Sequence, residues 1–137
     1  MEDINKIAVI CGGSSPEREV SLNSGNGVKD ALLQLGLKSD LIDYSDIQDF
    51  NDLYDYELVF IALHGFEGEN GELQARLDKM NIVFTGSKSS ACTNTWNKNL
   101  CKKILNENSI NTPKSILLNN LQNCSDNPFD SFQSKFG

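Results

Sequence analysis

The chain has 137 residues, of which 12 are basic and 19 acidic, and its formal net charge is -7. A chain of this length predicts about one domain that buries on the order of two thirds of its unfolded surface, enough for an independent core. The acidic balance, without a basic stripe or interleaved aromatic residues, argues against nucleic acid and anionic membranes as partners. Small molecules or proteins are the expected ligands.

The N-terminus and the cysteines predict a cytoplasmic protein. The opening segment MEDINK carries two acidic residues, and the apolar run after it is shorter than the apolar core of a signal peptide. The four cysteines show no C-x-x-C spacing, so we expect free thiols rather than disulfides or a zinc site. They are Cys11, Cys92, Cys101 and Cys124.

The chain is organised around the stretch Lys6–Gly25, in which an apolar run, a glycine pair and a helix start follow one another. The run Ile7–Cys11 is apolar without alternation, which predicts a strand covered on both faces, as in a parallel sheet. Gly12 and Gly13 then permit a tight turn and a close approach of the backbone to a ligand. The glycine pair fits neither G-x-G-x-x-G nor the Walker A pattern, so it does not by itself predict a nucleotide site.

The helix after this turn has two possible starts. Either Ser15 is the N-cap and Pro16 the first helical residue, or Ser14 is the N-cap and Glu17 completes a capping box. In both cases Glu17 lies in the first turn, where free N–H groups and the helix dipole favour the ionised carboxylate. Glu17 therefore either accepts hydrogen bonds from a substrate ammonium or only caps its own helix.

The following elements are predicted from apolar periodicity and turn residues. They are a helix closing at Gly36, a short strand at Leu41-Ile42, a polar connector from Tyr44 to Tyr56 with a helical turn around Phe50–Leu53, and a strand at Leu58–Leu63.

That strand ends at His64, the only histidine of the chain. Ligands of an open parallel sheet bind beyond the carboxyl ends of its strands, so His64 and the glycine turn are expected at one edge. A neutral imidazole there orients Glu17, contacts a substrate carboxylate, or simply satisfies loop carbonyls. A glycine-rich loop follows, and then a helix over Glu72–Met80.

A third short strand is predicted at Ile82–Phe84, followed by a helical tract from Ser89 to Asn108. The order strand, glycine turn, helix thus occurs three times, which predicts a Rossmann-like, doubly wound parallel α/β fold. Lys98, Lys102 and Lys103 form the one basic cluster, for which a solvated helix face is the alternative to a binding role.

The character of the chain changes near Asn111, where a proline breaks the helix. A short strand at Ser115–Leu118 and a helix over Pro128–Phe136 are predicted next. We therefore expect an N-terminal α/β domain over residues 1–110 and the truncated start of a second domain over residues 111–137.

Three segments resemble, in order and spacing, motifs of the D-alanine–D-alanine ligase family. The first is Gly12–Leu22 with Ser24-Gly25, the second is His64-Gly65 with Gly68–Gly71 and Leu73-Gln74, and the third is Thr85–Ser87 with Lys98. The resemblance covers about residues 5–114. The family's enzymes are much longer than this chain.

This resemblance implies an ATP-grasp ligase of peptidoglycan synthesis, which uses ATP and Mg²⁺ and makes the D-alanyl-D-alanine dipeptide through an acyl phosphate. By motif position, Glu17 is implied as the catalytic residue that binds the ammonium of the first D-alanine, with His64 beside it. Ser21 is implied to orient Glu17, and Lys98 to approach the nucleotide. The resemblance also implies a homodimer formed through the N-terminal domain, with a contribution from the surface around Leu73–Met80.

The sequence departs from the family pattern at three places. Asn70 stands where aspartate is usual, Lys88 where glycine is common, and Trp96-Asn97 where Met-Asp is typical. The family's Mg²⁺ and phosphate ligands belong to domains beyond this chain, so we expect these 137 residues alone neither to bind ATP tightly nor to ligate D-alanine. The alternatives are a free-standing α/β binding or regulatory module and an ATP-grasp ligase that makes another amide or a depsipeptide.

Overall fold

A computed structural model of the chain describes residues 6–117 and residue 133. The packing divides the chain into two compact units, Met1–Trp96 and Asn97–Gly137. This division into packing units does not test the domain boundary expected after residue 110, which stays a prediction. Within the described residues, every helix is too short or too polar to cross a membrane.

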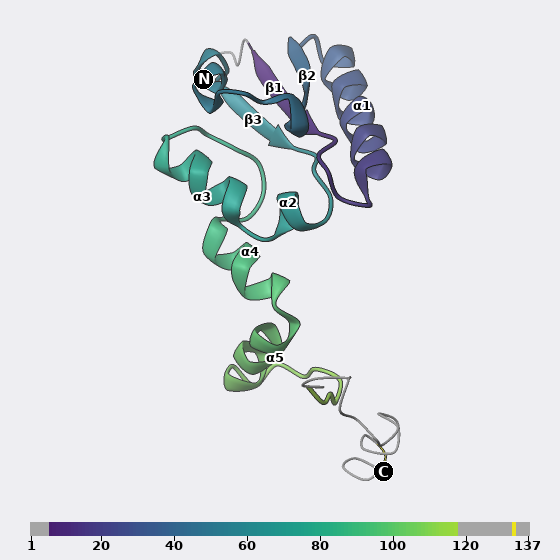
Figure 1. Ribbon diagram of the computed structural model, residues 1–137, viewed down its shortest axis with the longest axis vertical. Helices are drawn as coiled ribbons and strands as arrows, with labels where there is room; N and C mark the ends of the chain where they lie inside the picture. The colour runs from purple at the N-terminus through teal and green to yellow at the C-terminus, as the bar shows by residue number, and fades with distance from the viewer. Residues whose placement is uncertain (1–5, 118–132, 134–137) are drawn as a thin grey trace. The chain divides into compact units, whose positions relative to one another are not determined.

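The first unit is built on a three-stranded parallel sheet in the order β2-β1-β3 (Figure 1). Its strands are β1 (Ile7–Cys11), β2 (Ser39–Asp43) and β3 (Leu58–Ile61). In the register, Ile7 of the central strand stands opposite Ser39 on one side and Leu58 on the other. The predicted α/β class with a parallel sheet is thereby confirmed. The apolar run at Ile82–Phe84 joins β3 only through a single bridge, Val59 to Phe84, and is not a full strand.

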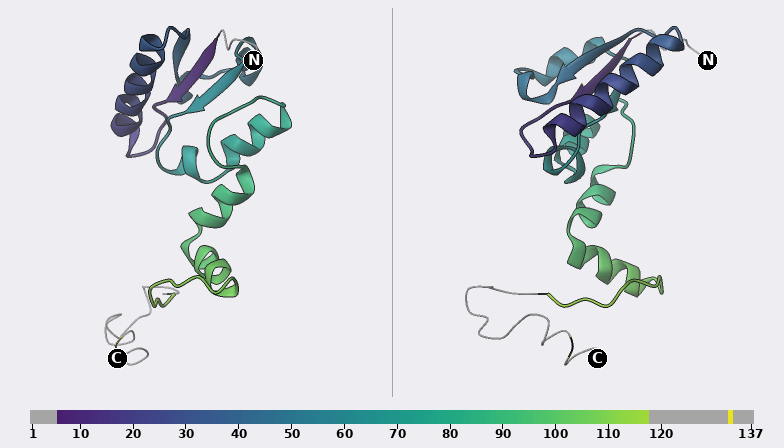
Figure 2. Two further views of the ribbon diagram at one scale, coloured as in Figure 1. Left: turned by 180° about the vertical axis from the view of Figure 1, so that it is seen from behind. Right: turned by 90° about the vertical axis from the view of Figure 1, so that its right-hand side faces the viewer.

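Helix α1 (Arg18–Gln34) covers one face of the sheet (Figure 2). It approaches closely because Gly25 faces the end of β1: a Cβ on Gly25 would lie 2.6 Å from the Cβ of Cys11. The helix closes as predicted at Gly36, which has a φ of 76°. The N–H of Gly36 donates to Leu33 O and that of Leu37 to Leu32 O, both at 3.0 Å, which is the Schellman arrangement.

The opposite face of the sheet is covered by the connector and by helix α3. The connector forms two 3₁₀ helices, η1 (Tyr44–Asp46) and η2 (Phe50–Asp55), and α3 spans Glu72–Lys79. Side chains alternate along β1, so Ile7, Val9 and Cys11 pack in the cluster shared with α1, while Ala8 and Ile10 pack with η2 and α3. Both faces of the sheet are therefore buried, which explains why β1 is apolar without alternation.

The glycine-rich loop after β3 is more regular than expected, because it contains a one-turn helix, α2 (Phe66–Glu69). Gly65, which precedes α2, has φ 76° and ψ -155°, a conformation that is essentially restricted to glycine. A Cβ on Gly68 would lie 2.6 Å from the carbonyl oxygen of Leu63. Both glycines are thus required by the backbone geometry of this loop.

The helical tract predicted over Ser89–Asn108 is two helices, α4 (Ser89–Trp96) and α5 (Lys98–Glu107). Asn97 breaks the tract because its side chain accepts hydrogen bonds from the N–H groups of Asn99 and Leu100, both at 3.1 Å. An asparagine that caps the second helix competes with continuation of the first. The periodicity predicted the helical structure of this tract correctly, but not the break at Asn97, which the capping side chain causes.

The second unit is described from Asn97 to residue 117 and at residue 133. Lys102 is not on a solvated helix face, since its Nζ donates to Thr112 Oγ1 at 2.9 Å and to Pro113 O at 2.6 Å. Residues 115–117 form no strand, in contrast to the prediction for Ser115–Leu118. The predicted helix over Pro128–Phe136 and Cys124 lie outside the described residues, except for residue 133.

Candidate functional site

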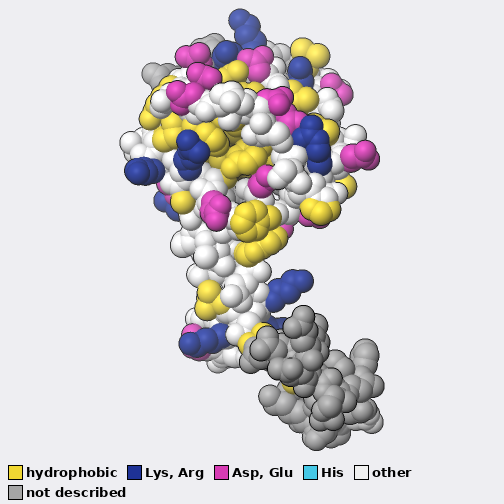
Figure 3. Space-filling model, viewed as in Figure 1, with side chains coloured by type: hydrophobic (Ala, Val, Ile, Leu, Met, Phe, Trp, Pro, Cys, Tyr) yellow, Lys and Arg dark blue, Asp and Glu magenta, His cyan; other side chains and the backbone are white. Residues whose placement is uncertain are grey.

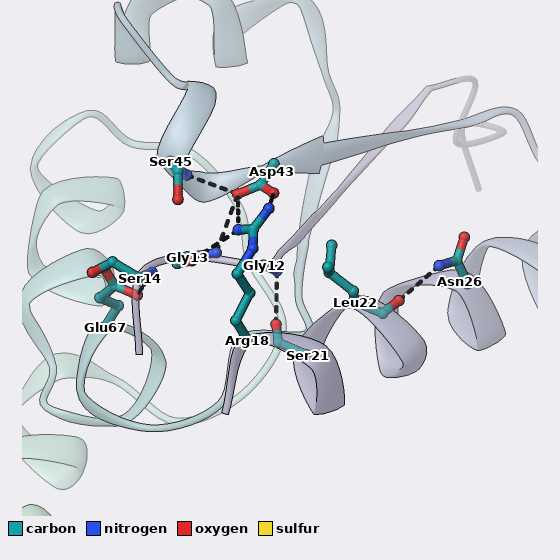
Figure 4. Close-up of polar contacts among 10 residues, drawn as sticks. All are labelled: Gly12, Gly13, Ser14, Arg18, Ser21, Leu22, Asn26, Asp43, Ser45 and Glu67. Atoms are coloured by element: carbon teal, nitrogen blue, oxygen red, sulfur yellow. Dashed lines mark hydrogen bonds and ion pairs between the residues drawn. The ribbon is translucent and has the colours of Figure 1, made fainter. Parts of the chain in front are cut away.

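The glycine turn after β1 directs three consecutive N–H groups at side-chain acceptors from three other parts of the first unit (Figure 4). The bonds are Gly12 N–H to Ser21 Oγ (2.9 Å), Gly13 N–H to Asp43 Oδ1 (3.1 Å) and Ser14 N–H to Glu67 Oε2 (2.8 Å). Donors of this kind cradle phosphate when they are free. Here all three are occupied, two of them by carboxylates, so this turn is not a phosphate cradle.

Asp43, at the carboxyl end of β2, is held by Arg18 from the first turn of α1 (Figure 4). The two guanidinium nitrogens contact the two carboxylate oxygens, Nη1 to Oδ1 at 3.0 Å and Nη2 to Oδ2 at 2.5 Å. Nη1 also donates to Gly13 O at 2.8 Å. The Arg18 guanidinium, joined by the N–H groups of Ser45 and Gly13, holds the pKa of Asp43 well below its ordinary value, against the opposing effect of partial burial. Asp43 is therefore an anion at neutral pH, held by the fold beside the turn.

Ser21 lies fully buried on the inner face of α1 and links the ends of two strands. Its hydroxyl accepts from Gly12 N–H and donates to Ala62 O, both at 2.9 Å. The expected orienting contact with Glu17 is not a side-chain bond: Ser21 meets Glu17 only through the backbone, with Ser21 N–H donating to Glu17 O at 3.0 Å. Ser21 thus fixes the start of α1, from which Glu17 projects.

Glu17 stands directly before the first residue of α1 and makes no side-chain capping bond. Its N–H donates to Ser15 Oγ at 3.1 Å, the bond expected of a capping Ser15, but α1 begins only at Arg18 with Glu17 at the N-cap position, so the prediction that Pro16 is the first helical residue is wrong. The capping-box alternative is wrong, because the hydroxyl and N–H of Ser14 are both bound to Glu67, at 2.7 and 2.8 Å. Among the described residues, nothing donates a hydrogen bond to the Glu17 carboxylate or forms an ion pair with it.

The Glu17 carboxylate lies over Gly65, at the start of α2. A Cβ on Gly65 would lie 2.6 Å from Glu17 Oε2 and 3.1 Å from Ser15 Oγ. Gly65 is thus required twice, by its own backbone conformation and by the carboxylate packed above it. The predicted meeting of the glycine turn with the loop after β3 at one edge of the sheet is present.

His64 lies half-buried at the same edge, and within the described part of the chain its hydrogen bonds go to Ser24 and Ser15 rather than to Glu17. Its Nε2 is 3.0 Å from Ser24 Oγ, which lies about two turns along α1 from Glu17. Its carbonyl oxygen accepts from Ser15 Oγ at 3.1 Å. The two alternatives that His64 orients Glu17 or contacts a substrate carboxylate both stay predictions.

An open hollow of about 280 Å³ lies beside Glu17. Its lining combines hydroxyl, carboxylate and aromatic side chains: Ser14, Ser15, Pro16, Glu17, Gly65, Phe66, Glu67 and Trp96. Phe66 and Trp96 contact each other edge to face, with ring centroids 5.9 Å apart and planes at 72°. The lining of the hollow is thus both acidic and aromatic.

Comparison with known proteins gives the following relatives, although no family model matches the chain. Over 115 residues it is 42% identical to the D-alanine–D-alanine ligase of Francisella philomiragia, and the matched region covers 82% of this chain and 39% of that ligase. Over 114 residues it is 40% identical to the Bordetella pertussis ligase, covering 82% and 36% of the two chains.

Solved structures agree. The D-alanine–D-alanine ligase of Bacillus anthracis in complex with ATP superposes with a TM-score of 0.76 at 31% identity, over 97% of this chain and 45% of that one. The D-alanyl-alanine synthetase A of Vibrio cholerae does so with a TM-score of 0.75 at 26% identity, over 96% and 45%. The chain belongs to the D-alanine–D-alanine ligase family. It spans less than half the length of the members that it matches.

One departure from the pattern of D-alanine–D-alanine ligases has a structural account. Asn70 is buried, and its side-chain oxygen accepts from Glu72 N–H at 2.8 Å at the start of α3. Its carbonyl oxygen accepts from Thr93 Oγ1 at 3.0 Å. A neutral amide performs this role without burying a charge.

Lys98, expected at the nucleotide, is the exposed first residue of α5 and belongs to the second unit. Its role toward ATP stays a prediction. Within the described residues, no group of three His, Cys, Asp or Glu side chains is arranged to hold a metal ion.

Sequence reasoning missed Arg18, Asp43 and Glu67. An acidic residue at the carboxyl end of β2, where ligands of doubly wound folds bind, was the available signal for Asp43. Arg18 then follows as its counter-ion from the first turn of α1. Glu67 carried no signal of its own, because only the close packing of the two loops makes it a partner of Ser14.

Proposed function

We propose that this chain is the N-terminal, substrate-binding part of an ATP-dependent D-alanine–D-alanine ligase, in which Glu17 binds the ammonium of the first D-alanine. The observation that carries the proposal is the free carboxylate of Glu17. It projects from the start of α1 into an open hollow and, within the described part of the chain, has neither a hydrogen-bond donor nor a cation beside it.

The electrostatics of the hollow favour a cation over an anion. Glu17 and Glu67 both line it, and the N–H groups of the glycine turn that attract phosphate are already bonded. The one guanidinium at this edge, Arg18, is paired with Asp43. An ammonium that donates to Glu17 forms charge-assisted hydrogen bonds, each worth about 1.5–3 kcal/mol.

In the longer protein that this proposal implies, the carboxylate of the first D-alanine attacks the γ-phosphate of ATP, and the amine of the second D-alanine displaces phosphate from the acyl phosphate. Glu17 holds the ammonium of the first D-alanine and so fixes the direction of its carboxylate. Mg²⁺, where bound, neutralises phosphate charge. The described residues offer no metal-binding cluster, so no step is assigned to a metal on this chain.

The proposal is tested by titrating the 137-residue chain with D-alanine and following amide chemical shifts by NMR. Glu17→Gln keeps the shape of the side chain but removes its charge, and we expect it to weaken binding at least about tenfold. Glu19→Gln is the matched control, because Glu19 is exposed in the first turn of the same helix. Equal affinities of wild type and Glu17→Gln would refute the assignment.

The chain alone is expected neither to bind ATP at micromolar concentration nor to release phosphate when D-alanine is added. The basis is its net charge of -7 and the internal carboxylates that fill the glycine turn. Calorimetry with ATP and a phosphate-release assay check this expectation. A chain that binds ATP tightly by itself would point instead to a complete nucleotide site within these residues.

The proposal extends to the assembly and the cell compartment. A homodimer formed through the first unit is tested by sedimentation equilibrium, and a monomer at high micromolar concentration would contradict it. The surface around Leu73–Met80 contributes little apolar area, since Leu73 and Leu77 are buried in the unit's own core. We expect the ligase in the cytoplasm, where ATP is available, and cell fractionation tests this.

A further inference from the structure

The aromatic side of the hollow consists of Phe66, the first residue of α2, and Trp96, the last residue of α4. Both rings are large and exposed, Phe66 by 52% and Trp96 by 44%. Figure 3 shows that apolar side chains are exposed at several places on this face of the molecule, with acidic side chains among them. Two exposed aromatic rings in contact beside a carboxylate are a common arrangement for recognising an ammonium group, since a ring face attracts a cation within about 6 Å.

The pair is held in place by polar contacts between the elements that carry it. Thr93, one turn before Trp96, donates to Asn70 O at 3.0 Å and so ties α4 to the end of α2. A Cβ on Gly71 would lie 2.6 Å from Ser89 O, which shows how closely the start of α4 approaches the same loop. On the other side, Glu69 Oε1 accepts from Gly65 N–H at 3.0 Å across the turn of α2. The rings therefore form a positioned wall.

The wall and the carboxylate together limit the ligand. An ammonium bonded to Glu17 lies about 3 Å from its oxygens, so the side chain of an amino acid bound there lies in the hollow that Phe66 and Trp96 also line. We propose that the Phe66–Trp96 pair is the specificity wall of the Glu17 site, which admits amino acids with a small side chain and rejects those with a large one. This inference rests on the proposed function, because it requires the ammonium at Glu17.

Trp96 makes the inference directly testable, since it is the single tryptophan of the chain. Titration of the wild-type chain with D-alanine should change its tryptophan emission, and D-leucine should bind about tenfold more weakly than D-alanine. In Phe66→Ala the ratio of the two affinities should fall to about two or less, because removing one ring opens the wall to the larger side chain. Tyr54→Ala, which removes an aromatic ring with 58% exposure elsewhere on the first unit, should leave the ratio unchanged.

The outcomes separate the two proposals. If D-alanine does not bind, or binds equally to Glu17→Gln, the proposed function fails and the wall fails with it. If D-alanine binding depends on Glu17 but Phe66→Ala keeps the wild-type ratio, the wall alone is refuted. Unchanged emission at saturating D-alanine likewise refutes the place of Trp96 in the wall. Trp96→Leu, measured by calorimetry, is the second variant should Phe66→Ala lose its native circular dichroism, and it should lower the same ratio.

Discussion

Ser21→Ala tests whether the glycine turn is held by a single buried hydroxyl. The Ser21 side chain is fully buried, and its oxygen bridges Gly12 N–H at the end of β1 and Ala62 O just after β3. Alanine fills almost the same space but supplies neither a donor nor an acceptor. The substitution therefore leaves two backbone groups of buried residues without their partners.

The expected loss of stability follows from these two groups. Each buried polar group left unpaired costs about 1–3 kcal/mol, and alanine returns about 0.5 kcal/mol through its higher helix propensity. Allowing for partial relaxation, we expect the free energy of unfolding to fall by about 2–4 kcal/mol. With a urea m-value on the order of 1.5 kcal/mol/M, the midpoint should fall by about 1–3 M.

The assay is urea unfolding, followed by circular dichroism and by tryptophan emission. Asn26→Ala is the control in the same helix: Asn26 is exposed, and its side-chain amide only donates to Leu22 O at 2.9 Å. We expect that control to cost less than about 0.5 kcal/mol. Equal midpoints for the two variants would show that the turn does not depend on Ser21. The Ser21 variant should also weaken D-alanine binding, since it loosens the start of α1.

Three further changes test other parts of this edge. Gly65→Ala should destabilise the chain by about 1–3 kcal/mol and abolish D-alanine binding, because its Cβ would displace Glu17 Oε2. Its control is Gly27→Ala, which adds a Cβ in open space on α1 and should stabilise the chain by about 0.5–1 kcal/mol. If urea unfolding showed Gly65→Ala to be the more stable of the two variants, the geometry would be contradicted. Asp43→Asn should cost about 1–3 kcal/mol near neutral pH. Because Arg18 holds the pKa of Asp43 below its ordinary value, that advantage of the wild type should shrink as the pH falls below about 4, and a gap independent of pH would refute the pairing. Burial, and secondarily the charge of Asp43, raises the pKa of Cys11, so iodoacetamide should label Cys11 more slowly than Cys92 in the native chain; peptide mapping showing equal rates would contradict this.

The fold was largely predictable because its strongest signals are local. The non-alternating run at Ile7–Cys11 predicted a strand buried on both faces, and Gly36 predicted the end of α1. The misses occurred where neighbouring elements decide the outcome. Ile82–Phe84 lies at the edge of the sheet and pairs through only one bridge, and the helical tract is divided by the capping side chain of Asn97.

The candidate site was predictable in position but not in its bonds. Strand ends and glycine turns placed Glu17 and His64 at one edge, as a parallel sheet requires. Which side chain pairs with which depends on distances across loops far apart in sequence, such as Ser14 with Glu67. The periodicity of the sequence does not encode those distances. The spacing allowed a capping box between Ser14 and Glu17, but Ser14 is bound to Glu67 and the Glu17 N–H to Ser15 instead.

Glu17 differs from the other carboxylates at this edge in the bonds that its side chain makes. Asp43, Glu67 and Glu69 each accept a backbone N–H from the two loops, at Gly13, Ser14 and Gly65 respectively. These three acidic side chains hold the loops in shape, and their negative charge disfavours an anionic ligand. Glu17 stands among them directly before α1, yet its side chain bonds to no group in the described residues. A carboxylate that the fold itself does not use is suited to a cationic ligand.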